Sequence, residues 1–226
     1  FDILDHKIFE NFQYLKIKYK NKIYKLRINL YGSIQIKNLF MAILASKVCG
    51  LKVENILNKI DRIESVEGRL QLKRILTNNS KIFLDYAHTP EALEKAILSL
   101  REHFNKKISV IFGCGGERDK SKRKLMGKIA SRYCDKIYIT DDNPRQESPS
   151  KIREDIKKGI KKAEIIEISN RKKAIAKAII NLNTGNILIV AGKGHEKTQQ
   201  VGSKKIFLSD RQIILSSIKK KKFRII

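Results

Sequence analysis

Hydrophobic and polar residues alternate along two stretches near the start of the chain, in the period-two pattern of half-buried strands. These stretches are residues 12–19 and 22–30, and the polar pair between them predicts a tight hairpin. A turn, a short strand and a helix over about residues 37–49 are expected next, with Gly50 ending that helix. Residues 52–60 predict a second, shorter helix. A hairpin and two helices are too little to enclose a hydrophobic core. This stretch is therefore interpreted as the end of a larger domain.

From about residue 69 the pattern changes to short apolar strands that alternate with helices, each strand ending in a glycine-rich or polar turn. The expected strands are residues 82–84, 108–112, 137–140, 165–168 and 187–190. The expected helices are residues 90–103, 122–133, 150–163 and 171–183. Alternation of this kind predicts an α/β fold, with an open, Rossmann-like, mostly parallel sheet and helices on both of its faces.

Three clusters of unusual polar residues follow the expected strands. In open parallel sheets, ligands bind beyond the carboxyl ends of the strands, so the clusters should meet at one edge. The first cluster, residues 85–90, contains Asp85 and His88. These two side chains either face the crevice or only hold the turn through bonds to the backbone, and the sequence leaves both readings open.

The second cluster is a glycine loop at residues 113–116, followed by charged residues that include Arg118. Glycines permit close approach of the backbone, and a guanidinium suits a carboxylate or a phosphate. The loop matches neither the GxxxxGK[ST] pattern nor GxGxxG, so it is not interpreted as a nucleotide loop.

The third cluster joins residues 140–145 to residues 192–196 and contains Arg145 and Glu196. A cation and an anion at one sheet edge suit a ligand that carries both a carboxylate and an ammonium, such as the end of an amino acid. The alternative is a loop salt bridge beside an Asx-Pro turn.

The composition is that of a globular protein, with 42% hydrophobic and 32% charged residues. Three cysteines without CxxC spacing argue against a disulfide framework and a zinc knuckle. The formal charge of +26 raises the possibility of a basic nucleic-acid-associated module, yet the lysines are spread along the chain and only residues 219–222 form a compact run. No specific nucleic-acid or membrane partner is therefore expected, and the protein is expected to be a cytoplasmic monomer.

Four runs, in this order and spacing, resemble the C-terminal half of MurE-type Mur ligases: LDYAHTPEALEKAI, FGCGGERDKSKRKLMG, TDDNPR and VAGKGHE. Gly32, Asn38 and the run EGR at residues 67–69 resemble the end of the central domain of that family. The resemblance implies that residues 1–67 are the last part of the ATP-binding central domain and that residues 68–226 form the amino-acid-binding C-terminal domain. The DNPR form of the third run goes with meso-diaminopimelate.

The resemblance also implies a reaction and its ligands. ATP would phosphorylate a carboxylate of UDP-MurNAc-L-Ala-D-Glu, and the amine of meso-diaminopimelate would then form the amide of peptidoglycan synthesis. The residues expected to contact diaminopimelate are Arg118, Asp142, Asn143, Pro144, Arg145, Gly192 and Glu196. The residues expected near ATP are Asn38, Arg69, Asp85 and His88.

The GKT phosphate loop, the magnesium-binding acids and the carbamylated lysine of the family have no counterpart in this chain. The resemblance therefore places the ligands of Mg²⁺ in an N-terminal half, names no certain catalytic residue or metal ligand here, and implies that this stretch alone is inactive. Two related enzymes remain as alternatives, a lysine-adding ligase and a folylpolyglutamate synthase-like ligase, and the DNPR run argues against both.

Overall fold

The computed structural model describes residues 1–220, which divide into two compact units. The first unit comprises Phe1–Val66 together with Leu98–Asn105. The second unit comprises Glu67–Ile97 and the residues from Lys106 onward. Of the basic run at residues 219–222, the last two residues lie outside the described part of the chain.

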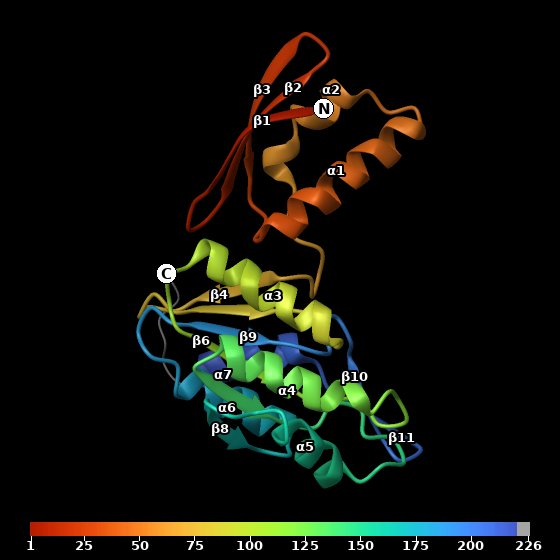
Figure 1. Cartoon of the computed structure of the whole chain (residues 1–226), viewed down its shortest axis with the longest axis vertical. Coiled ribbons are helices and arrows are strands. Elements are labelled where there is room, and N and C mark those ends of the chain that lie inside the picture. Colours follow the sequence, from red (N-terminus) through yellow and green to blue (C-terminus); the bar gives the residue numbers. More distant parts are fainter. Residues whose placement is uncertain (221–226) are drawn as a thin grey trace. The chain divides into compact units, whose positions relative to one another are not determined.

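The first unit contains an antiparallel sheet in the order β1-β2-β3 (Figure 1). Its strands are β1 (Asp2–Ile8), β2 (Gln13–Tyr19) and β3 (Lys22–Ile28). The predicted hairpin between β2 and β3 is confirmed, whereas β1 was missed. Its helical elements are α1 (Ser33–Val48), α2 (Val53–Leu57) and the 3-10 turn η1 (Ile60–Arg62). The core lies between the sheet and these helices and includes Leu15, Ile17, Leu26, Ile28, Ile36, Leu39, Ile43 and Leu57.

The prediction of a short strand before residue 37 is wrong, because α1 already begins at Ser33. The side-chain amide of Gln13 is buried and donates hydrogen bonds to the carbonyl oxygens of Leu30 and Gly32. These bonds satisfy the backbone where β3 ends, so the chain turns at Gly32, with φ of +84°, straight into a helix. Gly50, with φ of +88°, follows the last turn of α1 as predicted.

The second unit is built on a six-stranded sheet in the order β4-β5-β9-β6-β7-β8. The strands are β4 (Gln71–Ile75), β5 (Lys81–Leu84), β6 (Ile108–Phe112), β7 (Lys136–Ile139), β8 (Glu164–Glu167) and β9 (Ile187–Val190). Neighbours from β5 to β8 pair in parallel, and β4 is an antiparallel edge strand that the sequence did not reveal. The predicted α/β fold with a mostly parallel sheet is confirmed.

Helices cover both faces of this sheet, with α3 and α4 on one face and α6 and α7 on the other (Figure 1). Their bounds are α3 (Pro90–His103), α4 (Ser121–Tyr133), α5 (Pro149–Lys157), α6 (Arg171–Ile180) and α7 (Asp210–Lys220). Thr89 caps α3, because its hydroxyl accepts a hydrogen bond from the Ala92 amide. The hairpin of β10 (Thr198–Val201) and β11 (Lys204–Phe207), like α7, was not predicted.

Helix α5 ends well before the expected residue 163, at Lys157. A Cβ at Gly159 would lie 2.0 Å from the Lys124 carbonyl oxygen of α4, so only glycine allows these two segments of the backbone to approach this closely. The approach ends α5 and turns the chain toward β8. Helix α6 also stops early, at Ile180.

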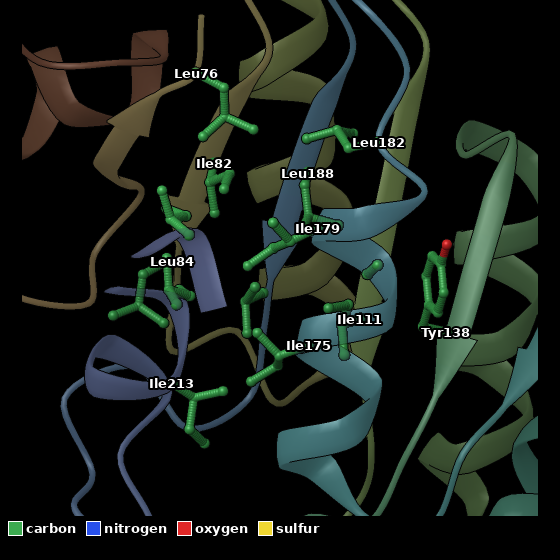
Figure 2. Close-up of a cluster of buried hydrophobic side chains, with 14 residues drawn as sticks. Leu76, Ile82, Leu84, Ile111, Tyr138, Ile175, Ile179, Leu182, Leu188 and Ile213 are labelled. Carbon is green, nitrogen blue, oxygen red and sulfur yellow. The ribbon is translucent and has the colours of Figure 1, made fainter. Parts of the chain in front are cut away.

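The apolar core beneath α6 and α7 is formed by residues from one face of the sheet, which are every second residue along each strand (Figure 2). Ile175 and Ile179 of α6 and Ile213 of α7 pack in one cluster with Ile111 and Leu188 of the sheet. Residues one position along each strand point to the opposite face. Both faces must therefore be apolar, and the strands read as continuous hydrophobic runs. Among residues 1–220, no helix is long and apolar enough to cross a membrane.

Candidate functional site

The polar clusters meet at the carboxyl edge of the sheet in the second unit, where they enclose a cavity of about 540 Å³. Four loops form it, and they follow β5, β6, β7 and β9. Because these strands are parallel, their ends meet at one edge. Six of the seven residues expected to contact an amino acid line this cavity: Arg118, Asp142, Asn143, Arg145, Gly192 and Glu196. The seventh, Pro144, is buried and is not among the residues that line the cavity.

Arg145 is held in an unusual backbone conformation, with φ of +52°. Its amide donates to the Gln200 carbonyl, and its own carbonyl accepts from the Gly202 amide, so the β10–β11 hairpin braces it on both sides. Its Nη1 donates to the Gly116 carbonyl oxygen at 2.6 Å. This bond and a longer one from Nη1 to the Asn143 carbonyl oxygen, at 3.5 Å, fix the guanidinium plane and leave Nε and Nη2 for a ligand in the cavity.

The glycine loop after β6 approaches the segment that carries Arg145 too closely for any side chain. A Cβ at Gly116 would lie 1.9 Å from the Pro144 carbonyl oxygen, and one at Gly115 would lie 2.9 Å from Arg145 Nη1. The glycines therefore allow two loops to pack at the cavity wall. Arg118, just beyond the loop, is exposed, and its side chain makes no hydrogen bond or ion pair within residues 1–220.

Asp142 lies at the cavity wall with most of its surface buried. Its carbonyl oxygen accepts from the Gln199 side-chain amide at 2.6 Å, which anchors the backbone. Its carboxylate, in contrast, has no hydrogen-bond or ion-pair partner in the described part of the chain. A partly buried carboxylate without a partner suits a ligand ammonium, because a charge removed from water requires an opposite charge.

Glu196 differs from Asp142 in that the protein itself already pairs it. Its Oε2 accepts from Lys193 Nζ at 2.7 Å and from Asn143 Nδ2 at 3.3 Å. Burial raises the pKa of Glu196, but the bonds from Lys193, Asn143 and Tyr86 outweigh burial and lower it. Glu196 is therefore held as a carboxylate with one oxygen already occupied.

The first cluster supports both readings that the sequence left open. Asp85 accepts hydrogen bonds from the backbone amides of Leu70, at 2.5 Å, and Ala87, at 2.7 Å, so both of its oxygens hold the chain. Burial raises the pKa of its carboxyl, while these bonds lower it to a smaller extent. His88 does both, because it lines the cavity while its Nδ1 lies 2.9 Å from the Tyr86 carbonyl oxygen of the same turn. The guanidinium of Arg69 lies 4.5 Å from the ring centroid of Tyr86.

The remaining predicted residue, Asn38, lies on α1 in the first unit and donates to the Gln35 side chain at 3.2 Å. Three residues that the sequence reasoning missed contribute to the site in the second unit: Tyr86, Lys193 and Gln199. Only Lys193 carried a usable signal, because glycines flank it in a loop directly after a buried strand.

Comparisons with known proteins find one matching family. Residues 68–194 match the family described as Mur ligase, glutamate ligase domain. The chain is 44% identical, over 92% of its length, to the UDP-N-acetylmuramoyl-L-alanyl-D-glutamate--2,6-diaminopimelate ligase of Rickettsia rickettsii. It is 40% identical, over 85% of its length, to the protein of the same name from Buchnera aphidicola subsp. Schizaphis graminum. It spans 43% and 39% of the lengths of these two relatives.

A solved structure titled UDP-N-acetylmuramoyl-L-alanyl-D-glutamate--2,6-diaminopimelate ligase also superposes on the chain, with a TM-score of 0.73 and 28% sequence identity. The superposition covers 98% of this chain and 46% of that structure. The similarity therefore extends through both units of the chain.

Proposed function

Because the chain belongs to the Mur ligase family, whose glutamate ligase domain covers residues 68–194, we propose that its second unit binds the amino acid that a peptidoglycan ligase adds. The proposed amino acid is meso-diaminopimelate, and the proposed acceptor is UDP-MurNAc-L-Ala-D-Glu. Two relatives that are at least 40% identical carry names that contain UDP-N-acetylmuramoyl-L-alanyl-D-glutamate and 2,6-diaminopimelate. We further assign residues 1–67 to the end of an ATP-binding central domain and residues 68–226 to the amino-acid-binding domain.

The observation that carries the proposal is the arrangement of charge in the cavity. Arg118 and Arg145 present guanidinium groups to it, and Asp142 presents a carboxylate that forms no ion pair or hydrogen bond within residues 1–220. The far end of diaminopimelate carries one carboxylate and one ammonium, so it complements these groups, whereas the far end of lysine carries an ammonium alone. A planar guanidinium also binds a carboxylate through two parallel hydrogen bonds, which fixes the orientation of the ligand.

The contribution of this chain to the reaction would be to position the ligand. A ligand held at one end by Arg145 and Asp142 presents its other end in a fixed direction, and this converts an encounter between two molecules into a reaction within one complex. Phosphate transfer from ATP would activate the carboxylate of the acceptor, and the amine of diaminopimelate would displace phosphate to form the amide. The protein would thus supply orientation and exclude competing amines.

For ATP, the proposed contacts are Arg69 and His88, with Asn38 near the base. Asp85 is proposed to position Arg69, because its two oxygens accept hydrogen bonds from backbone amides and one of these amides belongs to the neighbouring Leu70. The family chemistry implies magnesium. Residues 1–220 contain no cluster of three or more His, Cys, Asp or Glu side chains suited to a metal.

Calorimetric titration of the purified chain tests the amino-acid site. Meso-diaminopimelate should bind, and lysine should bind far more weakly, because lysine lacks the second carboxylate and leaves Arg145 unpaired. In the complete ligase the preference should reach roughly a thousandfold in catalytic efficiency, or about 4 kcal/mol. Equal affinity for the two amino acids would remove the diaminopimelate assignment, and absence of binding by either would remove the site.

The Arg145→Lys substitution tests the same site more narrowly. A lysine ammonium cannot reproduce the two parallel bonds of a guanidinium, so affinity for diaminopimelate should fall by on the order of 2 to 3 kcal/mol. The matched control is Arg132→Lys, at an exposed position of α4 outside the cavity, which should bind as the unchanged chain does. A change of less than about threefold in the Arg145→Lys variant would contradict the role of Arg145.

A further inference from the structure

Lys193 is a fully buried lysine in the loop that follows β9. The glycines on either side of it have positive φ angles, +109° at Gly192 and +50° at Gly194. A Cβ at Gly192 would lie 3.0 Å from the Asp142 carboxylate, and one at Gly194 would lie 2.8 Å from the Tyr86 side chain. The loop is therefore packed tightly on both sides, and Lys193 has little freedom to point elsewhere.

The ammonium of Lys193 closes a triangle of hydrogen bonds behind the cavity wall. Its Nζ donates to Glu196 Oε2 at 2.7 Å and to Asn143 Oδ1 at 3.1 Å. The third side of the triangle is the bond from Asn143 Nδ2 to Glu196 Oε2, at 3.3 Å. Asn143 Oδ1 also accepts from the Gln200 amide at 2.9 Å. Lys193 thus fixes two of the side chains that line the cavity.

This triangle changes the charge that a ligand meets. Glu196 is paired with an ammonium, so the two charges cancel at short range, whereas the Asp142 carboxylate has no such partner within the described residues. One net carboxylate then faces the ligand beside the guanidinium groups of Arg118 and Arg145. Without Lys193, two unpaired carboxylates would face it.

We propose that Lys193 is a specificity-determining positioning residue: by pairing with Glu196 and orienting Asn143, it sets the cavity to prefer a ligand end that carries both a carboxylate and an ammonium. Removal of Lys193 would favour ligands whose end carries an ammonium alone. This inference rests on the proposed amino-acid site and adds a reason for its selectivity. Lys193 acts through its neighbours, since it lies behind the residues that line the cavity.

The test measures the ratio of affinities for meso-diaminopimelate and lysine in the purified chain. Lys193→Met, which keeps most of the length of the side chain without its charge, should lower that ratio at least tenfold. Glu196→Gln leaves Lys193 charged and unpaired and should raise the ratio. The double substitution removes both charges and should return the ratio toward its original value. Lys197→Met, at an exposed position four residues along, is the control and should leave it unchanged.

A purely structural role for Lys193 predicts a different pattern. It would weaken both ligands equally, and Glu196→Gln would not compensate, so either result would overturn the proposal. Folding of each variant is checked by circular dichroism. If Lys193→Met does not fold, the rise expected for Glu196→Gln alone still decides the question, and an unchanged or lower ratio there overturns it.

A second measurement needs no ligand and separates the two proposals. Nuclear magnetic resonance of the lysine ammonium groups should show that the protons of Lys193 exchange slowly with water. Its resonance should also respond when the carboxylate of Glu196 titrates. If the unchanged chain binds neither amino acid, the proposed function fails, while this measurement still tests the triangle. Exchange at Lys193 as fast as at Lys197 would overturn the inference.

Discussion

The two units differ in how they bury their apolar residues. In the second unit, strands β5 and β9 are buried along their whole length, because helices cover both faces of the sheet. In the first unit, α1 carries apolar residues around its entire circumference, yet its outer face stays uncovered: Met41 is 66% exposed and Val48 is 88% exposed. A helix that is apolar on all sides is typical of a position buried on all sides.

This difference indicates where the stability of the chain resides. The second unit covers the central strands of its sheet with its own helices, and its exposed apolar residues, such as Leu125 and Phe207, lie outside those strands. The first unit leaves one face of its longest helix in water, which contributes nothing to folding and favours association. The second unit should therefore be the more stable part, and substitutions within it should have the larger effects. Three predictions test this comparison.

The largest effect is expected at the ion pair between Arg171 and Asp210 in the second unit. Both side chains are fully buried, with Arg171 Nε and Nη2 donating to the two oxygens of Asp210 at 2.8 and 2.7 Å. Arg171→Ala would leave a buried carboxylate unpaired and should lower the free energy of unfolding by about 3 to 5 kcal/mol. Urea denaturation followed by circular dichroism measures the change.

The matched control is Glu54→Gln, which removes the exposed pair between Lys20 and Glu54 in the first unit. Exposed pairs often contribute nothing measurable, so this variant should unfold as the unchanged chain does. Similar losses in the two variants would contradict the idea that stability is concentrated in the second unit.

A smaller effect, dependent on pH, is expected in the first unit at His103. Its Nδ1 lies 2.9 Å from the Phe9 carbonyl oxygen, and its Nε2 accepts from the Gly32 amide at 2.8 Å, which requires a neutral ring. Burial lowers the pKa of His103 in the folded state. The unfolded state therefore binds the proton more readily, and the stability that His103 contributes is present above pH 6.5 and lost as the pH falls through the lowered value.

The loss should be on the order of 1 kcal/mol, because protonation breaks the bond from the Gly32 amide. Denaturation of the first unit, followed by amide exchange at pH 7.5 and at successively lower pH, measures it. His103→Gln should remove this pH dependence, whereas His195→Gln, at an exposed position of the second unit, should retain it. A response that persists in His103→Gln would assign it to another group.

The smallest effect on stability is expected at the uncovered face of α1. Val48→Lys should change the free energy of unfolding by no more than about 0.5 kcal/mol, since the side chain is mostly in water. The same change should reduce self-association, because it places a charge in an apolar patch. Sedimentation velocity at several concentrations measures association. Unchanged association would show that this face does not mediate self-association. A large loss of stability would show that the Val48 side chain is buried.

The sequence alone determined the features of this protein that depend on local pattern. Apolar runs of four or five residues, each followed by glycine or a charged cluster, were sufficient to predict strands such as Ile108–Phe112 and helices such as Pro90–His103. Because the carboxyl ends of parallel strands share one edge, the same pattern also predicted that Arg118, Asp142 and Glu196 would line one cavity.

Only the tertiary structure decided which charges in that cavity are available. Lys193 is one of 49 basic residues, and the glycines that flank it mark a tight loop without revealing which side chains it meets; the fold buries it against Glu196 and Asn143. Likewise, Asp85 was expected near a nucleotide, and its oxygens prove to hold backbone amides. The physical reason is that periodicity reports which face of an element is apolar, whereas the partner of a polar group is set by residues far away in the sequence.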